Sequence, residues 1–257
     1  MRHNNQNVKG ISRCIRYAFM PNRLHLCGPE SQADILEFYA KARGSQTSTK
    51  SIRPVLEGFE TMYPYLELIA RENQGKDPFD EKIVEAYWVG NRLLGNVAAK
   101  SLFNHLTDKV SLKKHLGLRD FRKFAENFNI GSLPHHNFHV LNIYRRTGKT
   151  KELHSPASYD ACRISWGRVI GVDKGYLKVR TRPLKMDGNG RIFEDDAIEK
   201  EILNEAEGAR LLTGARPGDY VSLHWGAVCE KLTREQVLNL QQYTDLSLAL
   251  ANSKVTD

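Results

Sequence analysis

The clearest structural signal in the C-terminal part of this chain is the stretch Pro217-Gly218-Asp219-Tyr220-Val221-Ser222-Leu223-His224-Trp225-Gly226. A proline-glycine-aspartate turn leads into a short alternating run, which predicts a strand that carries His224 to its far end. Earlier in the chain, another run typical of a strand follows Cys162. A thiolate and an imidazole at opposite ends of one small β-unit can meet at a metal ion, so Cys162 and His224 are candidate metal ligands.

Short β-type runs and turn signals fill residues 151–257. The segments 164–172 and 176–181 predict two strands separated by a tight turn, and an amphipathic helix is expected over 233–250. The acidic span 193–212 is expected to be partly helical. Five or so short strands with a terminal helix indicate a small barrel.

Helical periodicity dominates residues 1–150, with apolar residues at three- and four-residue spacing over 31–43, 54–73 and 97–108. We expect five or six helices here. The predicted fold class is therefore α+β: a helical N-terminal domain, residues 1–150, followed by a small OB-like β-barrel with a C-terminal helix, residues 151–257.

Composition fits a folded soluble protein of 257 residues with a formal net charge of +8. Residues 1–150 carry a net charge of +9 and residues 151–257 a net charge of −1. A basic half suits nucleic acid, an acidic partner, an anionic metabolite or simply a solvated surface. No nucleic-acid-binding motif accompanies the charge, so we do not expect a nucleic-acid partner. The sequence has no long apolar run and no signal peptide, which predicts a cytoplasmic protein without membrane contact.

Three of the nine histidines lie within Leu133-Pro134-His135-His136-Asn137-Phe138-His139-Val140. If the segment is helical, His135 and His139 lie on one face and can chelate a metal. If it is extended, His135 and His139 share one face opposite His136. The alternative is a polar loop with one buried, hydrogen-bonded histidine. All three are candidate catalytic or metal-binding residues, with a third ligand expected from Glu85 or Glu30.

Cys27 lies just before the helix expected from Ser31, where the positive end of a helix dipole lowers the pKa of a thiol. This position makes Cys27 a candidate reactive or ligating thiolate. The alternative is a buried cysteine in a packed turn.

The segment from Cys162 to about Leu250 resembles the small iron-carrying chaperone of nickel-iron hydrogenase assembly, the HypC/HupF type. The resemblance rests on Cys162 followed by Gly167-Arg168-Val169, then on Gly218-Asp219-Tyr220-Val221-Ser222-Leu223-His224-Trp225-Gly226-Ala227, and on the helix after Lys231. It implies that Cys162 and His224 hold iron (Fe²⁺), with zinc as an alternative metal. The implied partners are the hydrogenase large subunit precursor and a HypD-type assembly protein.

Two departures from that family are present. Its members begin at the cysteine, whereas Cys162 is internal, so no α-amino group is available as a ligand. The family's Ile-Pro before the glycine is Ser165-Trp166 here. One alternative is therefore a barrel of this type that has lost its metal and serves only in docking.

Two function hypotheses follow. The first is a hydrogenase accessory protein that binds or delivers iron, with an N-terminal domain that binds a metal, a ligand precursor or a partner. That N-terminal half resembles an uncharacterised bacterial family associated with hydrogenases. The second is a metal-dependent enzyme centred on His135, His136 and His139, making a small metabolite or a diatomic ligand for the hydrogenase iron, with the barrel as a docking module.

Overall fold

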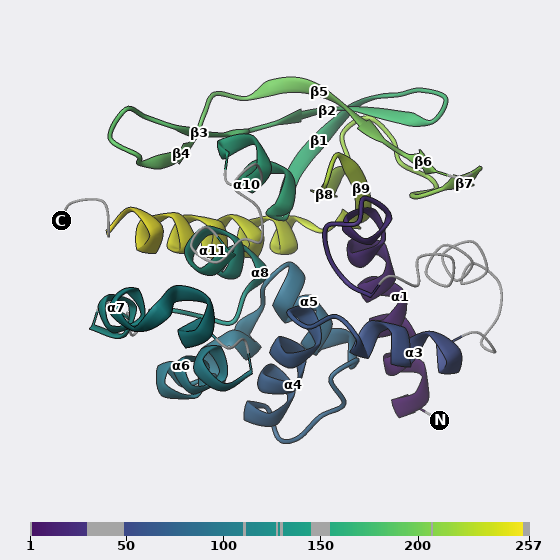
Figure 1. Cartoon of the computed structure of the whole chain (residues 1–257). Coiled ribbons are helices and arrows are strands. Elements are labelled where there is room, and N and C mark those ends of the chain that lie inside the picture. Colours follow the sequence, from purple (N-terminus) through teal and green to yellow (C-terminus); the bar gives the residue numbers. More distant parts are fainter. Residues whose placement is uncertain are drawn as a thin grey trace.

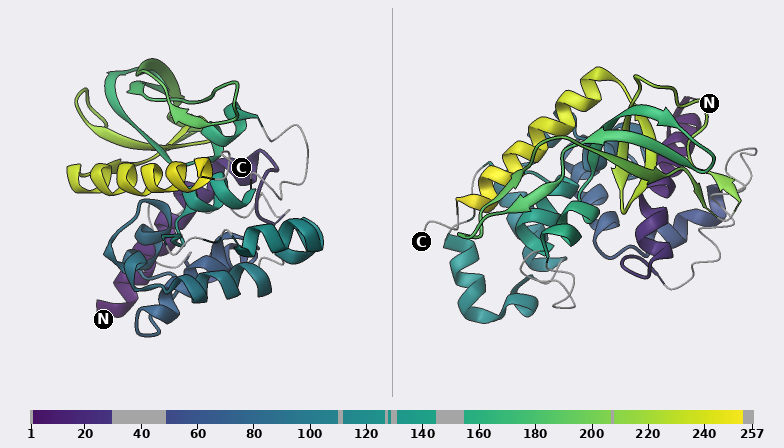
Figure 2. Two further views of the ribbon diagram at one scale, coloured as in Figure 1. Left: turned by 90° about the vertical axis from the view of Figure 1, so that its left-hand side faces the viewer. Right: turned by 90° about the horizontal axis from the view of Figure 1, so that it is seen from above.

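A computed structural model describes residues 2–29, 49–109, 112–126, 128, 131–144, 155–206 and 208–253 (Figure 1). Helices of the N-terminal part form one layer and the strands of the C-terminal part form another. The last helix, α11 (Arg234–Asn252), lies between them, as Figure 1 and the left view of Figure 2 show. The coarse prediction, a mixed fold with a helical N-terminal part and a C-terminal sheet and helix, is confirmed.

The N-terminal layer begins with a long helix, α1, that the sequence analysis did not predict. Its buried residues Ile11, Cys14, Ile15 and Ala18 follow helical spacing. Helix α1 spans Arg2–Arg23. It is followed along the chain by α3 (Thr49–Glu57), α4 (Met62–Glu72), α5 (Glu81–Trp88), η2 (Arg92–Asn96), α6 (Ala99–Asp108), α7 (Leu112–Glu126), α8 (His136–Phe138) and the π-helical η3 (His139–Tyr144). The predicted helix over 31–43 lies outside the described residues.

Five strands pair in the order β1-β2-β5-β9-β8. β1 pairs antiparallel with both β2 and β8, and β5 meets β9 at one parallel pair, Leu203 with Ala227. The bounds of these strands are Ser165–Val172 for β1, Tyr176–Thr181 for β2, Ile198–Leu203 for β5, Tyr220–His224 for β8 and Ala227–Leu232 for β9. Two small hairpins, β3 (Leu184–Met186) with β4 (Ile192–Glu194) and β6 (Glu205–Ala206) with β7 (Ala209–Arg210), complete the strands.

The expectation of partial helix over 193–212 is wrong, because this span contains strands β4 to β7. On β5, Glu199 and Glu201 lie directly opposite Arg180 and Lys178 of β2. Opposite charges across a strand pair stabilise a sheet. The acidic residues therefore support an exposed strand, not a helix.

Strand β8 is buried on both faces, which places it at the junction of the two layers. Val221 and Leu223 share one face, while Ser222 and His224 share the other. Ser222 bonds the Tyr17 hydroxyl of α1, so that second face meets the N-terminal helices.

One hydrophobic core includes side chains from both parts of the chain, for example Tyr17 and Trp88 together with Val221 and Leu240. The division into domains 1–150 and 151–257 stays a prediction. None of the described helices combines the length and the apolar character that a membrane span requires.

Candidate metal centre

His136, Cys162 and His224 gather at one place between the two layers. One ligand atom from each side chain lies within 4.8 Å of the other two. His136 opens α8, Cys162 ends the helix α10 (Pro156–Cys162), and His224 ends β8. Among the described residues, no other group of three His, Cys, Asp or Glu side chains lies this close together. Small side-chain movements bring such a set to bonds of about 2.0–2.3 Å, as found for zinc with nitrogen and sulfur.

The imidazole of His224 is held in the tautomer that a metal ligand requires. Its Nδ1 lies 2.7 Å from the carbonyl oxygen of Tyr17, and because a carbonyl only accepts, Nδ1 carries the proton. Nε2 is therefore a lone-pair acceptor. It is buried and makes no hydrogen bond of regular geometry within the described part of the chain, although the Cys162 carbonyl is near the ring. In a metal-bound histidine, the ring nitrogen that does not bind the metal usually donates its proton to a carbonyl or a carboxylate, as Nδ1 of His224 does here.

The ring of His136 is oriented in a similar way. Its Nε2 lies 2.9 Å from the carbonyl oxygen of Cys162 and donates to it. Nδ1 then holds the lone pair, and the hydroxyl of Tyr87 donates to it over 3.1 Å. A metal on Nδ1 would replace this hydrogen bond from Tyr87.

Cys162 is partly buried, and its position is set by a tight turn between β8 and β9. Trp225 and Gly226 form this two-residue turn with φ values of 49° and 74°, as a type I′ turn requires. The amide of Trp225 donates to the carbonyl of Ala161 over 2.8 Å, and its indole lies close enough to the Cys162 sulfur to lower the pKa of that thiol. A left-handed backbone conformation is uncommon for a bulky residue, so Trp225 is locally strained. This strained residue lies next to Cys162, the candidate ligand.

Burial controls the protonation of all three side chains. It lowers the pKa of His224 to about 4 and that of His136 well below its usual value, with the charge of His224 adding to the effect on His136. Both imidazoles are therefore neutral at neutral pH and able to bind a cation. Burial raises the pKa of the Cys162 thiol, the charge of Cys27 raises it further, and the nearby Trp225 indole opposes both. A bound cation would favour the thiolate.

Two imidazoles and one thiolate suit a transition metal of intermediate softness, such as iron(II) or zinc. The buried Nε2 of His224, whose lone pair has no hydrogen-bond donor among the described residues, is suited to bind such an ion. Three protein ligands leave coordination positions open for a substrate, a small ligand or a partner's side chain. The indole of Trp88 lies 4.6 Å from the His136 ring and 5.7 Å from the His224 ring, which gives the centre an aromatic wall.

The structure separates His135 and His139 from this cluster. Because α8 begins at His136, His135 is an extended N-cap residue whose Nδ1 accepts from the Asn137 amide. Its ring stacks on Tyr243 at 5.3 Å. His139 instead bonds the hydroxyl of Tyr65 over 3.1 Å. His135 therefore lies outside the helix, and of the three histidines only His136 joins Cys162 and His224 in one group.

None of the other sequence-predicted residues that the structure describes belongs to the group of three. Cys27 is exposed, and its charge acts on Cys162 and on Tyr87. Glu85 does not face the cluster but forms a salt bridge of 3.0 Å with Arg13. Glu30 lies outside the described residues.

Asn137 is a supporting residue that sequence reasoning missed. Its side-chain oxygen accepts from the amide of Ile164 over 2.7 Å, and its nitrogen donates to the carbonyl of the same residue over 2.8 Å and to Thr244. These bonds join α8 to the chain just after Cys162. The sequence signal was present, since Asn137 directly follows His136, but only the fold shows its partners.

The sequence model of a family of unknown function, DUF6390, matches residues 6–257. No curated protein and no solved structure matches the chain.

Proposed function

We propose that this chain, which belongs to the DUF6390 family of unknown function, binds iron through His136, Cys162 and His224 and acts as an accessory protein in nickel-iron hydrogenase assembly. The observation that carries the metal-binding part is the close approach of His136, Cys162 and His224, together with the buried Nε2 of His224, which has no hydrogen-bond partner among the described residues. A buried imidazole lone pair without a partner is costly unless a ligand completes it.

The hydrogenase part of the proposal rests on the resemblance to the HypC/HupF type. The two residues that the resemblance assigns to iron, Cys162 and His224, lie together in the fold although they are far apart in the sequence. In place of the α-amino group that an internal cysteine lacks, His136 supplies a nitrogen. The pairing of β1, β2, β5, β9 and β8 in a ring supports the OB-like barrel that belongs to this proposal.

The remaining parts of the proposal concern delivery. The open coordination positions would accept the carbonyl and cyanide ligands of the hydrogenase iron, or a side chain of a partner. The partners would be the hydrogenase large subunit precursor and a HypD-type assembly protein, in the cytoplasm. The N-terminal part contributes His136 and the carbonyl of Tyr17, so both parts of the chain would be needed to hold the metal.

Metal binding is tested by anaerobic purification, reconstitution with Fe²⁺ and metal quantitation. We expect one ion per chain, and we expect Cys162→Ser, His136→Gln and His224→Gln each to lose it. His135→Gln is the matched control and should keep the ion, because its side chain lies outside the cluster. Zinc should compete, since it binds such ligands more tightly than Fe²⁺.

The same variants separate the alternative function, an enzyme centred on His135, His136 and His139. That alternative requires metal to be retained in Cys162→Ser and lost in His135→Gln or His139→Gln. Infrared spectroscopy of protein co-expressed with the hydrogenase assembly proteins tests the delivery step. Carbonyl and cyanide bands that vanish in Cys162→Ser support it, whereas bound iron without such bands limits the function to metal binding.

A further inference from the structure

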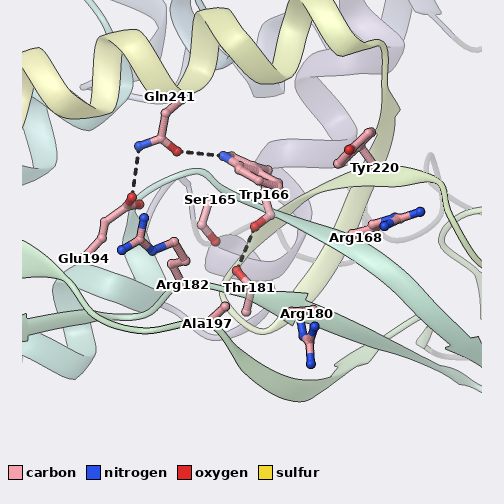
Figure 3. A pocket seen from close by; sticks show the side chains of 10 residues that line it. All are labelled: Ser165, Trp166, Arg168, Arg180, Thr181, Arg182, Glu194, Ala197, Tyr220 and Gln241. Carbon is pink, nitrogen blue, oxygen red and sulfur yellow. Dashed lines mark hydrogen bonds between the residues drawn. The ribbon is translucent and has the colours of Figure 1, made fainter.

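A hollow lies on the C-terminal part, outside the metal centre. It is a cavity of about 220 Å³ bordered by β1, β2, β8 and α11 (Figure 3). None of the three candidate metal ligands lines it. We call it the Trp166 pocket, after the side chain that forms its aromatic wall together with Tyr220. The two rings meet edge to face at 5.8 Å.

The aromatic wall of the Trp166 pocket is held rigidly. The indole nitrogen of Trp166 donates to Gln241 over 2.9 Å, and Gln241 donates to Glu194 over 2.9 Å (Figure 3). Glu194 is in turn paired with Arg163, which is almost fully buried. A wall whose side chains are already fixed loses little conformational entropy when a ligand binds.

The open side of the pocket carries positive charge. Arg168 of β1 and Arg180 of β2 are directly opposite each other in the sheet register, and both are exposed. Like charges at directly opposite positions destabilise a strand pair. In the view of Figure 3, Glu194 and Arg182 lie on one side of the hollow and these two arginines on the other.

The described acidic residues offset this charge only weakly. Glu199 approaches Arg180 to 3.9 Å but is held by Lys178 at 2.7 Å. No ion pair of Arg168 is found within the described ranges. An anion bound at the open side would therefore relieve the repulsion between Arg168 and Arg180.

We propose that the Trp166 pocket binds a nucleoside monophosphate, with the base against Trp166 and the phosphate on Arg168 and Arg180. Stacking of a base on an aromatic side chain contributes about 1–3 kcal/mol and suits any base. Two guanidinium groups fit a phosphate dianion better than they fit a single carboxylate. Each guanidinium can donate two hydrogen bonds to phosphate oxygens, and the two positive charges balance the two negative charges. This binding goes beyond the proposed iron function and does not require the metal.

Isothermal titration of the metal-free full chain with AMP, and separately with inorganic phosphate, tests the proposal. We expect AMP to bind and phosphate alone to bind at least about tenfold more weakly, a difference of about 1.4 kcal/mol. Arg168→Ala and Arg180→Ala should each weaken AMP binding by a similar factor. Arg92→Ala, an exposed arginine of η2, is the charge-matched control and should bind AMP like the wild type.

A second readout uses tryptophan fluorescence. AMP should quench the emission of the wild-type chain, and Trp166→Phe should lose this quenching while keeping a cooperative thermal transition. The proposal is overturned if AMP does not bind, if phosphate binds as tightly as AMP, or if both arginine variants bind like the wild type. Binding of a tryptophan-containing acidic peptide without binding of AMP would also overturn it.

Discussion

At the residue scale, Trp225 links the backbone to the candidate metal centre. Its φ of 49° belongs to a region that bulky residues rarely adopt, and its indole lies near the Cys162 sulfur, where it lowers the pKa of the thiol. Asparagine adopts this backbone conformation readily but lacks the indole. Trp225→Asn should therefore keep the turn and weaken metal affinity by about 10–100-fold, the usual effect of losing a residue that supports a ligand.

A competition titration with a metal chelator measures this effect of Trp225→Asn. Asn189→Ala, in an exposed loop, is the control and should bind metal like the wild type. Unchanged affinity in Trp225→Asn would show that the indole does not support Cys162.

Buried histidines outside the centre predict a loss of stability in acid. Burial lowers the pKa of His135 and His139 to about 3 and that of His105 to about 4. Because these values lie below the ordinary value of about 6.5, the unfolded chain takes up protons first as the pH falls. The free energy of unfolding should therefore be fully present above about pH 6.5 and decline below it, by up to about 1.4 kcal/mol per pH unit for each histidine.

Urea unfolding at about pH 7.5 and pH 5.5 measures this decline. His139→Gln should lose less stability between these two conditions than the wild type does, because glutamine does not titrate. An equal loss in both proteins would mean that His139 does not contribute to the pH dependence.

Part of the centre was predictable from residue types alone. Cys162 and His224 stood at the ends of segments with clear strand patterns. His136 was one of three adjacent candidates, and only the start of α8 decides which of them faces the cluster. Trp225 had no local signal, because its role depends on the register between β8 and β9.

At the element scale, Asn137 fixes α8 to the start of β1. Asn137→Ala would leave the amide and the carbonyl of Ile164 buried without these partners. The variant should lower the free energy of unfolding by about 2–4 kcal/mol, since each unmet buried group costs about 1–3 kcal/mol. It should also weaken metal binding, because His136 is the preceding residue.

Chemical denaturation compares Asn137→Ala with Asn189→Ala, whose exposed side chain should change stability by less than about 0.5 kcal/mol. Equal stability of the two variants would contradict a bridging role for Asn137.

Elements with strong local signals were predictable. Strands β1, β2 and β8 had alternating runs bounded by turn residues, and α11 began at a capping residue, Thr233, whose capping box is present. Helix α1 was missed because Gly10 and Pro21 lower the helix propensity of its sequence. Gly10 has a tertiary reason, since a side chain there would collide with the carbonyl of Phe79.

At the scale of the whole molecule, a buried ionic network joins the two parts of the chain. Arg13 of α1 pairs with Glu85 of α5 and with Glu230 of β9, each at 3.0 Å. Tyr17, whose carbonyl holds His224, also donates its hydroxyl to Glu230 over 2.9 Å. The network therefore positions the helix that supports the metal centre.

Substituting one charged residue of this network should lower the free energy of unfolding considerably. Glu230→Ala leaves Arg13 only partly compensated in a buried site, and we expect a loss of about 3–5 kcal/mol in the free energy of unfolding. The exposed Glu199→Ala should change it by no more than about 1 kcal/mol. Denaturant titration of both variants measures the difference, and a small effect of Glu230→Ala would argue against the network as a joint between the two parts.

The most direct test of the metal centre is a cobalt(II) titration of the metal-free chain under anaerobic conditions, followed by absorption spectroscopy. We predict one ion per chain and a thiolate-to-metal charge-transfer band. The band should disappear in Cys162→Ser, His136→Gln and His224→Gln, because each loses the ion, and it should persist in His135→Gln. Failure to bind the ion, or a band that persists in Cys162→Ser, would contradict the metal centre.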